Sequence, residues 1–179
     1  MTDMTATKRK GLKSGTRTEF SIFAKVKPGH AKALTEVLTG GAVQDPKVLK
    51  EGLKAIGTLH EARWVMFDDD TRVMFCSSFD GDWDTYIDDF GNTPAKDFFQ
   101  RAWSNTEGFP GINDPNVKDW FMDHAVEAKS YVITYDGTVK EILKALDLQE
   151  AFQRVLDDPA AEKALTNPAL KPLLDQAAT

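Results

Sequence analysis

Apolar residues recur at every second position in several stretches of the chain, which is the pattern of β-strands. The segment 20–26 alternates in this way and ends at Pro28-Gly29. Two more strands are predicted over 59–67 and 72–79. The four residues between them, 68–71, favour an antiparallel hairpin. A last strand is predicted over 128–135, where aromatic and β-branched residues cluster.

Between and after these strands, apolar residues are spaced three and four apart, which predicts amphipathic helices. The Asp45-Pro46 pair is typical of a helix start, with a capping carboxylate followed by proline. The expected helices are 31–38, a short one after Asp45-Pro46, 83–90, 95–103, one starting at 117, 139–146, and short helices from 148 to the end.

The predicted order is β-α-β-β-α-β with extra helices. Two β-α-β connections of this kind give an α+β fold of ferredoxin-like type, a four-stranded antiparallel sheet with helices on one face. We expect this domain to span 19–146. Residues 1–18 are expected to be a disordered basic tail, and residues 147–179 a C-terminal helical arm.

Composition limits the function classes. The 179 residues carry a formal net charge of −6, which argues against a nucleic-acid-binding protein. Cys76 is the single cysteine, so no internal disulfide can form. Because no apolar run is long enough to span a membrane and no secretory signal is evident, we expect a cytoplasmic protein.

The segment from Phe20 to Leu34, FSIFAKVKPGHAKAL, resembles the first strand and helix of the dimeric α+β barrel superfamily. Antibiotic-biosynthesis monooxygenase-like proteins belong to it, and chlorite dismutases and dye-decolourising peroxidases share the broader fold. Segments 59–64, 80–83 and 103–110 also resemble an uncharacterised bacterial family of this fold. The resemblance covers roughly residues 19–135 and implies a fold, not a reaction.

The residues themselves also favour a homodimer. The strands predicted over 20–26 and 128–135 are apolar on both faces. Phe23 points to the face away from Phe20, and Val132 points to the face away from Tyr131. Helices cover only one face of such a sheet, so a second copy of the chain is expected on the other. A hollow for a small ligand would then lie between sheet and helices or inside the barrel.

His60 and Arg63 are the predicted catalytic residues. His60 is a candidate general base or haem ligand, and a histidine bonded to the backbone at a strand start is the alternative. Glu61 and Arg63 share a face of their strand, so a plain ion pair between them is also open. The predicted substrate-binding residues are aromatic or polar and surround the same sheet: Trp64, Phe79, Tyr86, Trp103, Asn105, Phe109 and Tyr131.

No metal site is predicted. The three histidines, at 30, 60 and 124, lack the spacing of a metal motif. Asp80, Asp82 and Asp84 resemble the start of a calcium loop, but Thr85 and Gly91 stand where that loop needs glycine and glutamate. Helix capping explains these aspartates more simply.

Three functional hypotheses follow. The first is a small-molecule-binding dimeric barrel, an oxygenase-like enzyme acting on an aromatic or apolar substrate. The second is a haem-binding, peroxidase-related protein with His60 or His124 as the axial ligand. The third is a non-catalytic binding or assembly module that uses its C-terminal helices.

Overall fold

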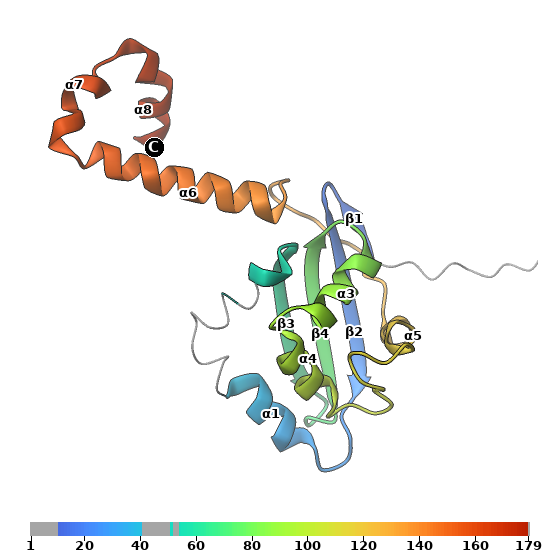
Figure 1. Ribbon diagram of the computed structural model, residues 1–179. Coiled ribbons are helices and arrows are strands. Elements are labelled where there is room, and N and C mark those ends of the chain that lie inside the picture. The colour runs from blue at the N-terminus through green and yellow to red at the C-terminus, as the bar shows by residue number, and fades with distance from the viewer. Residues whose placement is uncertain (1–10, 41–50, 52–53, 179) are drawn as a thin grey trace, which may run out of the picture. The chain divides into compact units, whose positions relative to one another are not determined.

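The computed structural model describes residues 11–40, 51 and 54–178. It shows a mixed α+β unit built on a four-stranded antiparallel sheet, up to Val139, and a separate helical unit from Lys140 onward (Figure 1). The helix predicted after Asp45-Pro46 lies mostly outside the described residues.

The sheet has the order β1-β2-β4-β3 and is antiparallel throughout. Its central pair joins strands that are far apart in sequence, with Phe20 opposite Ser77 and Ala24 opposite Val73. The strands are β1 Lys13–Ser14, β2 Arg17–Lys25, β3 Leu59–Phe67 and β4 Arg72–Asp80. The predicted hairpin between 59–67 and 72–79 is confirmed.

Three helices lie on one face of the sheet: α1 Ala31–Thr39, α3 Trp83–Asn92 and α4 Lys96–Trp103 (Figure 1). Asp82 caps α3 by accepting a hydrogen bond from Thr85 N at 2.9 Å, as its position before an aromatic stripe predicts. Helix α5, Val117–His124, follows, and the stripe of Val117, Trp120 and Phe121 is buried.

Aromatic rings fill the space between the sheet and these helices. Phe75 and Phe99 meet edge to face at 6.0 Å, and Phe90 stacks on Phe99 at 4.0 Å. Trp103 is fully buried and contacts the rings of Phe75 and Phe121. This core accounts for much of the aromatic content of the chain and fixes α3 and α4 against β4.

The strand predicted over 128–135 is wrong, because this segment is irregular. The chain leaves α5 and makes one antiparallel bridge to β2, between Ala125 and Ile22. Farther along, the β2 edge is already paired with β1, through Ser14 opposite Arg17. High β-propensity alone does not make a strand where no neighbour offers free hydrogen-bonding groups.

The sheet begins earlier than expected. Residues 13–14 and 17–18 fall in the segment predicted to be a tail, yet they form β1 and the start of β2. Gly15 makes the turn between them with a φ of +59°, and a Cβ there would collide with the carboxylate of Asp136. Glycine at this position therefore permits both the turn and the approach of Asp136.

The second unit consists of helices with few buried side chains. Its helices are α6 Val139–Leu156, α7 Glu162–Leu165 and α8 Lys171–Ala177. Val139, the first residue of α6, is also the last residue of the first unit. A 3-10 turn that starts at a proline precedes α7, and another precedes α8. Of the short helices predicted from 148 to the end, those after Pro159 and Pro168 are confirmed, whereas residues 148–156 continue α6. No helix among the described residues has the length and apolar character needed to cross a bilayer.

Candidate functional site

A cavity of about 530 Å³ lies where α1, β3 and α4 meet, and we name it the α1–β3–α4 cavity. Its volume falls within the range of small-molecule sites in proteins. The lining is largely apolar, with polar groups from α1, Arg63 and the hairpin. It comprises Thr35, Leu38, Thr39, Ala62, Arg63, Trp64, Met66, Asp70, Phe98 and Phe99.

Strand geometry explains why Trp64 enters this cavity. Ala62, Trp64 and Met66 pair with Ser77, Phe75 and Val73, so all three lie on the helix-covered face of the sheet. Because β3 is the edge strand of the described sheet, no further strand among the described residues closes the space between α1 and α4.

The indole of Trp64 is held by rings on its inner side. Its centroid lies 4.4 Å from that of Trp103 and 4.8 Å from that of Phe75. Phe98 meets it edge to face at 6.2 Å. The buried rings fix the orientation of the half-buried Trp64, which therefore presents a stable aromatic wall to the cavity.

Two charged side chains also line this cavity. Arg63 points to the opposite face of the sheet by its register with Cys76, yet its long side chain at the sheet edge reaches both faces. Within the described part of the chain, Arg63 forms no hydrogen bond or ion pair, and the alternative Glu61–Arg63 ion pair is not formed. Its guanidinium is thus available to a ligand.

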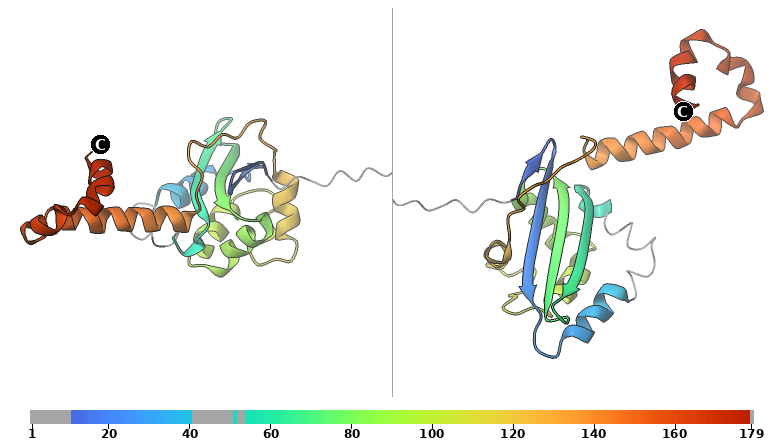
Figure 2. Two further views of the ribbon diagram at one scale, coloured as in Figure 1. Left: turned by 90° about the horizontal axis from the view of Figure 1, so that it is seen from above. Right: turned by 180° about the vertical axis from the view of Figure 1, so that it is seen from behind.

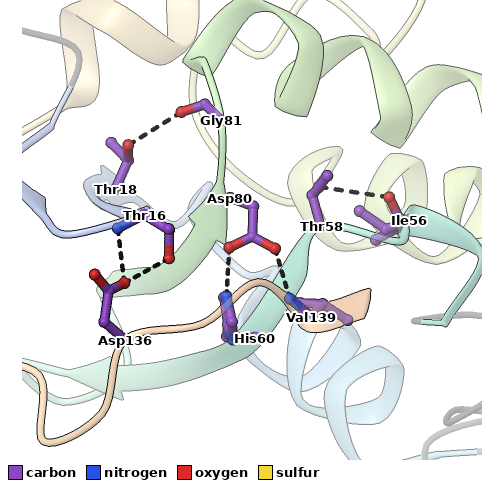
Figure 3. Close-up of polar contacts among 9 residues, drawn as sticks. All are labelled: Thr16, Thr18, Ile56, Thr58, His60, Asp80, Gly81, Asp136 and Val139. Atoms are coloured by element: carbon purple, nitrogen blue, oxygen red, sulfur yellow. Dashed lines mark hydrogen bonds and ion pairs between the residues drawn. The ribbon is translucent and has the colours of Figure 1, made fainter. Parts of the chain in front are cut away.

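His60, the predicted base, has a structural partner instead. A β-bulge places His60 as an extra residue between Leu59 and Glu61, so Leu59 faces the core while Glu61 faces the other side. His60 Nε2 donates to Asp80 Oδ1 at 2.7 Å, and both side chains are mostly buried (Figure 3). His60 lines neither of the two described cavities. Held in this way, its Nε2 does not fit the role of a haem ligand.

His124, the other candidate haem ligand, is also engaged. Its Nδ1 lies 2.7 Å from the carbonyl oxygen of Trp120, and its ring stacks on the Trp120 indole at 4.2 Å. These contacts pack the ring against the C-terminal end of α5. Among the described residues, no group of three or more histidine, cysteine or acidic side chains is placed to hold a metal ion.

Three of the predicted substrate-binding residues belong to the core. Phe79 and Tyr86 stack face to face at 3.8 Å, and both are buried, as is Trp103. Burial raises the pKa of Tyr86 far above its ordinary range, with a smaller upward effect from Asp89 and an opposing effect from the hydroxyl of Ser77. The phenol therefore stays neutral and does not act as a base.

Asn105 and Phe109 lie in the loop after α4, which caps the core. Asn105 Nδ2 donates to the carbonyl of Arg101, and its Oδ1 lies 3.0 Å from His30 Nδ1. Phe109 packs edge to face on Trp120 at 5.1 Å. Both side chains hold the loop in place, and neither lines a described cavity.

Sequence reasoning thus found Arg63 and Trp64 but missed the other residues of the cavity. Leu38 and Phe98 belong to apolar helical stripes, for which the sequence predicts burial in the core. Asp70 lies in the predicted turn between two strands. Tyr131, predicted on a strand, lines a second cavity on the opposite face of the sheet. No protein-family model, curated protein or solved structure matches the chain.

Proposed function

We propose that the protein binds a small, predominantly apolar or aromatic molecule in the α1–β3–α4 cavity. The observation that carries the proposal is the combination of a 530 Å³ volume with a lining dominated by Leu38, Trp64, Met66, Phe98 and Phe99. Burying a planar apolar ligand against such a surface is favourable at about 25 cal/mol per Å². Arg63 would donate hydrogen bonds to one polar group of the ligand.

The lining favours binding over catalysis. A cofactor-independent oxygenase-like reaction on a phenol needs a base near the substrate hydroxyl. Asp70 supplies the one carboxylate of this described lining, and His60 is directed to Asp80 instead. An oxygenase-like activity would therefore have to use Asp70, and we rank it behind simple binding.

A calorimetric titration with 2-naphthol tests the proposal, because this probe combines a flat apolar body with one hydroxyl. Phe98→Ala removes a cavity wall and should weaken binding about tenfold, since ~1.4 kcal/mol corresponds to a factor of ten. Phe109→Ala is the matched control, because Phe109 is also a partly buried phenylalanine but packs outside the cavity.

The proposal fails if 2-naphthol gives no saturable heat with the wild-type protein. It fails equally if Phe98→Ala and Phe109→Ala change the affinity by the same factor. Circular dichroism of each variant establishes that the fold is retained, so that a loss of affinity is assigned to the cavity.

We further propose the homodimer, with the face of the sheet opposite the helices as the interface. At one end of this face Phe23, Val65, Phe67 and Met74 form an apolar group, and Val65 is 40% exposed. A charge there should oppose self-association. Light scattering of Val65→Asp against the wild type tests this: a wild-type monomer, or an unchanged dimer in the variant, contradicts it.

A further inference from the structure

The second cavity lies on the face of the sheet that the helices leave uncovered. The segment 126–136, which we name the strap, crosses this face after α5 (Figure 2). Its first residue, Val126, donates its backbone N–H to Ser21 O at 2.9 Å. Its last residue, Asp136, accepts hydrogen bonds from the N–H and hydroxyl of Thr16 at 2.9 and 2.8 Å (Figure 3).

The register of the three long strands arranges the polar floor of this cavity in rows. Glu19 is opposite Ser78 across β2 and β4, and Ser78 is opposite Glu61 across β4 and β3. A serine hydroxyl thus lies between two glutamates, one on each side. Directly opposed residues of antiparallel strands have Cβ atoms about 4.5–5.5 Å apart, so Ser78 has one glutamate side chain beside it on each neighbouring strand.

The next row carries Ser21, Cys76 and Arg63 in the same order. Ser21 Oγ lies 3.3 Å from Cys76 Sγ and donates to Glu19 Oε2 at 3.0 Å. The strap contributes the roof. The cavity has a volume of about 330 Å³, and its lining also includes Ala62, Ser77, Ala128, Ser130 and Tyr131.

Three residues of this lining carry a buried hydroxyl group that lacks a hydrogen-bond partner within the described part of the chain: Ser77, Ser78 and Tyr131. Ser77 is opposite Phe20 and so lies on the helix-covered face of the sheet, which leaves Ser78 and Tyr131 for a ligand on the other face. Ser78 is 2% exposed, and its Oγ is both buried and unpaired. The Tyr131 hydroxyl on the strap is buried and unpaired as well. Most buried polar side-chain atoms in proteins are paired, and leaving one unpaired lowers stability. Both hydroxyls line a cavity in which a ligand would satisfy them.

The charges select the ligand class. Glu19 is buried, and the hydrogen bonds that its Oε1 accepts from described residues are long, from the N–H groups of Leu12 and Ala128 at 3.3 and 3.4 Å. Glu61 adds a second carboxylate and Arg63 one positive charge, so the lining carries a net charge of −1 when all three are ionised. A monovalent cation with several N–H donors neutralises this charge and supplies the missing hydrogen bonds.

We propose that the strap cavity binds the protonated primary amine of a small molecule. The ammonium group would lie over the row Glu19–Ser78–Glu61, where it donates to Ser78 Oγ and to the two carboxylates. The Tyr131 side chain would pack against the body of the ligand from above. A metal ion is a poorer occupant, since no cluster of three ligating side chains exists among residues 11–40, 51 and 54–178.

Three probes of one shape and different charge test the proposal: benzylamine, benzyl alcohol and benzoate. Binding is measured by calorimetry at pH 7. Cys76 offers a second readout, because it is the only cysteine and lines the cavity. Benzylamine should slow the alkylation of Cys76 by iodoacetamide, followed by intact mass spectrometry, while leaving the alkylation of free glutathione unchanged.

Three variants test whether benzylamine binding depends on the residues of this cavity. Glu61→Gln and Ser78→Ala should each weaken benzylamine binding about tenfold and remove the protection of Cys76. Glu107→Gln, an exposed glutamate outside the cavity, should change neither. Because Glu61 is exposed, its substitution leaves the fold intact even if a change at the buried Ser78 does not.

The proposal is overturned if benzyl alcohol or benzoate binds as tightly as benzylamine. It is also overturned if benzylamine shows no saturable binding, or if Glu61→Gln and Glu107→Gln behave alike. A Phe98→Ala variant distinguishes the two cavities: benzylamine binding and Cys76 protection should be unchanged in it, whereas 2-naphthol binding should be about tenfold weaker.

Discussion

His60 Nε2 donates a hydrogen bond of 2.7 Å to Asp80 Oδ1, while Asp80 Oδ2 accepts another of 2.7 Å from the backbone N–H of Val139 (Figure 3). One carboxylate thereby joins the bulge of β3, the end of β4 and the last residue of the first unit. Three segments distant in sequence depend on this group, which gives His60 a structural role.

Replacing His60 should therefore lower stability without abolishing ligand binding. His60→Ala leaves one oxygen of a mostly buried carboxylate unpaired, which costs about 1–3 kcal/mol. Urea unfolding followed by circular dichroism measures the change. If His60→Ala keeps wild-type stability but loses 2-naphthol binding, the histidine acts at the ligand, contrary to this interpretation.

The hairpin between β3 and β4 is a place where stability can be gained. Asp68, Asp69 and Asp70 all have positive φ angles, between 52° and 61°. This conformation costs an L-residue about 1–2 kcal/mol and costs glycine nothing comparable. Asp69→Gly should therefore raise the free energy of unfolding by about 1 kcal/mol. Asp69→Ala, which also removes the charge, is the control and should not stabilise the protein.

Acid should weaken the attachment of the strap. Hydrogen bonds from the N–H and hydroxyl of Thr16 hold the pKa of Asp136 below its ordinary value of 3.8. The ionised carboxylate thus contributes stability that is present above about pH 3.8 and lost as pH falls through the lower pKa of the folded state. Melting temperatures from pH 6 to pH 3 should fall more steeply for the wild type than for Asp136→Asn. Parallel curves would contradict this.

The hydroxyl of Tyr86 should be dispensable. It is buried and lacks a well-formed hydrogen bond among the described residues, while the ring stacks on Phe79 at 3.8 Å. Tyr86→Phe keeps the ring and removes the unsatisfied group, so stability should stay equal or rise by up to ~1 kcal/mol. A loss above this amount in denaturant unfolding would show that the hydroxyl has a partner.

Trp103 should behave as a core residue. Its side chain is fully buried and contacts Trp64, Phe75 and Phe121. Trp103→Ala should cost about 3–5 kcal/mol, as is usual for large-to-small changes at buried aromatic positions. Phe109→Ala, at the partly buried rim of the same cluster, should cost clearly less. Equal losses in thermal unfolding would contradict the assignment.

The periodicity of apolar residues in the sequence was sufficient to predict the strands and helices that bury one face. The strands at 59–67 and 72–79, their hairpin and the helix beginning at Trp83 follow directly from alternation, turn length and a capping aspartate. The strand over 128–135 failed because strand formation depends on a free edge. The edge of β2 is already occupied by β1, where Ser14 pairs with Arg17, and the local sequence pattern does not predict this pairing.

The candidate site was less predictable for a related reason. Aromatic residues in a stripe give no indication of how deeply each ring is buried: Phe98 and Phe99 both line the α1–β3–α4 cavity, but Phe99 is fully buried in the core and Phe98 is only partly buried. The bulge at His60 also shifted the face of Leu59 relative to Glu61. The row Glu19–Ser78–Glu61 becomes visible only once the strand register is known.

The strap is fixed at Val126 and at Asp136, with irregular backbone between them, and Val132 at its middle is 84% exposed. Ala128 and Tyr135 add weaker contacts, to Glu19 and to Arg17. We therefore expect the residues around Val132 to move away from the sheet more readily than the two ends. In such a motion the middle of the strap would be displaced while its two ends stay bound to the sheet. Amide hydrogens near Ser130 should exchange with solvent much faster than that of Val126, and an occupied cavity should slow them.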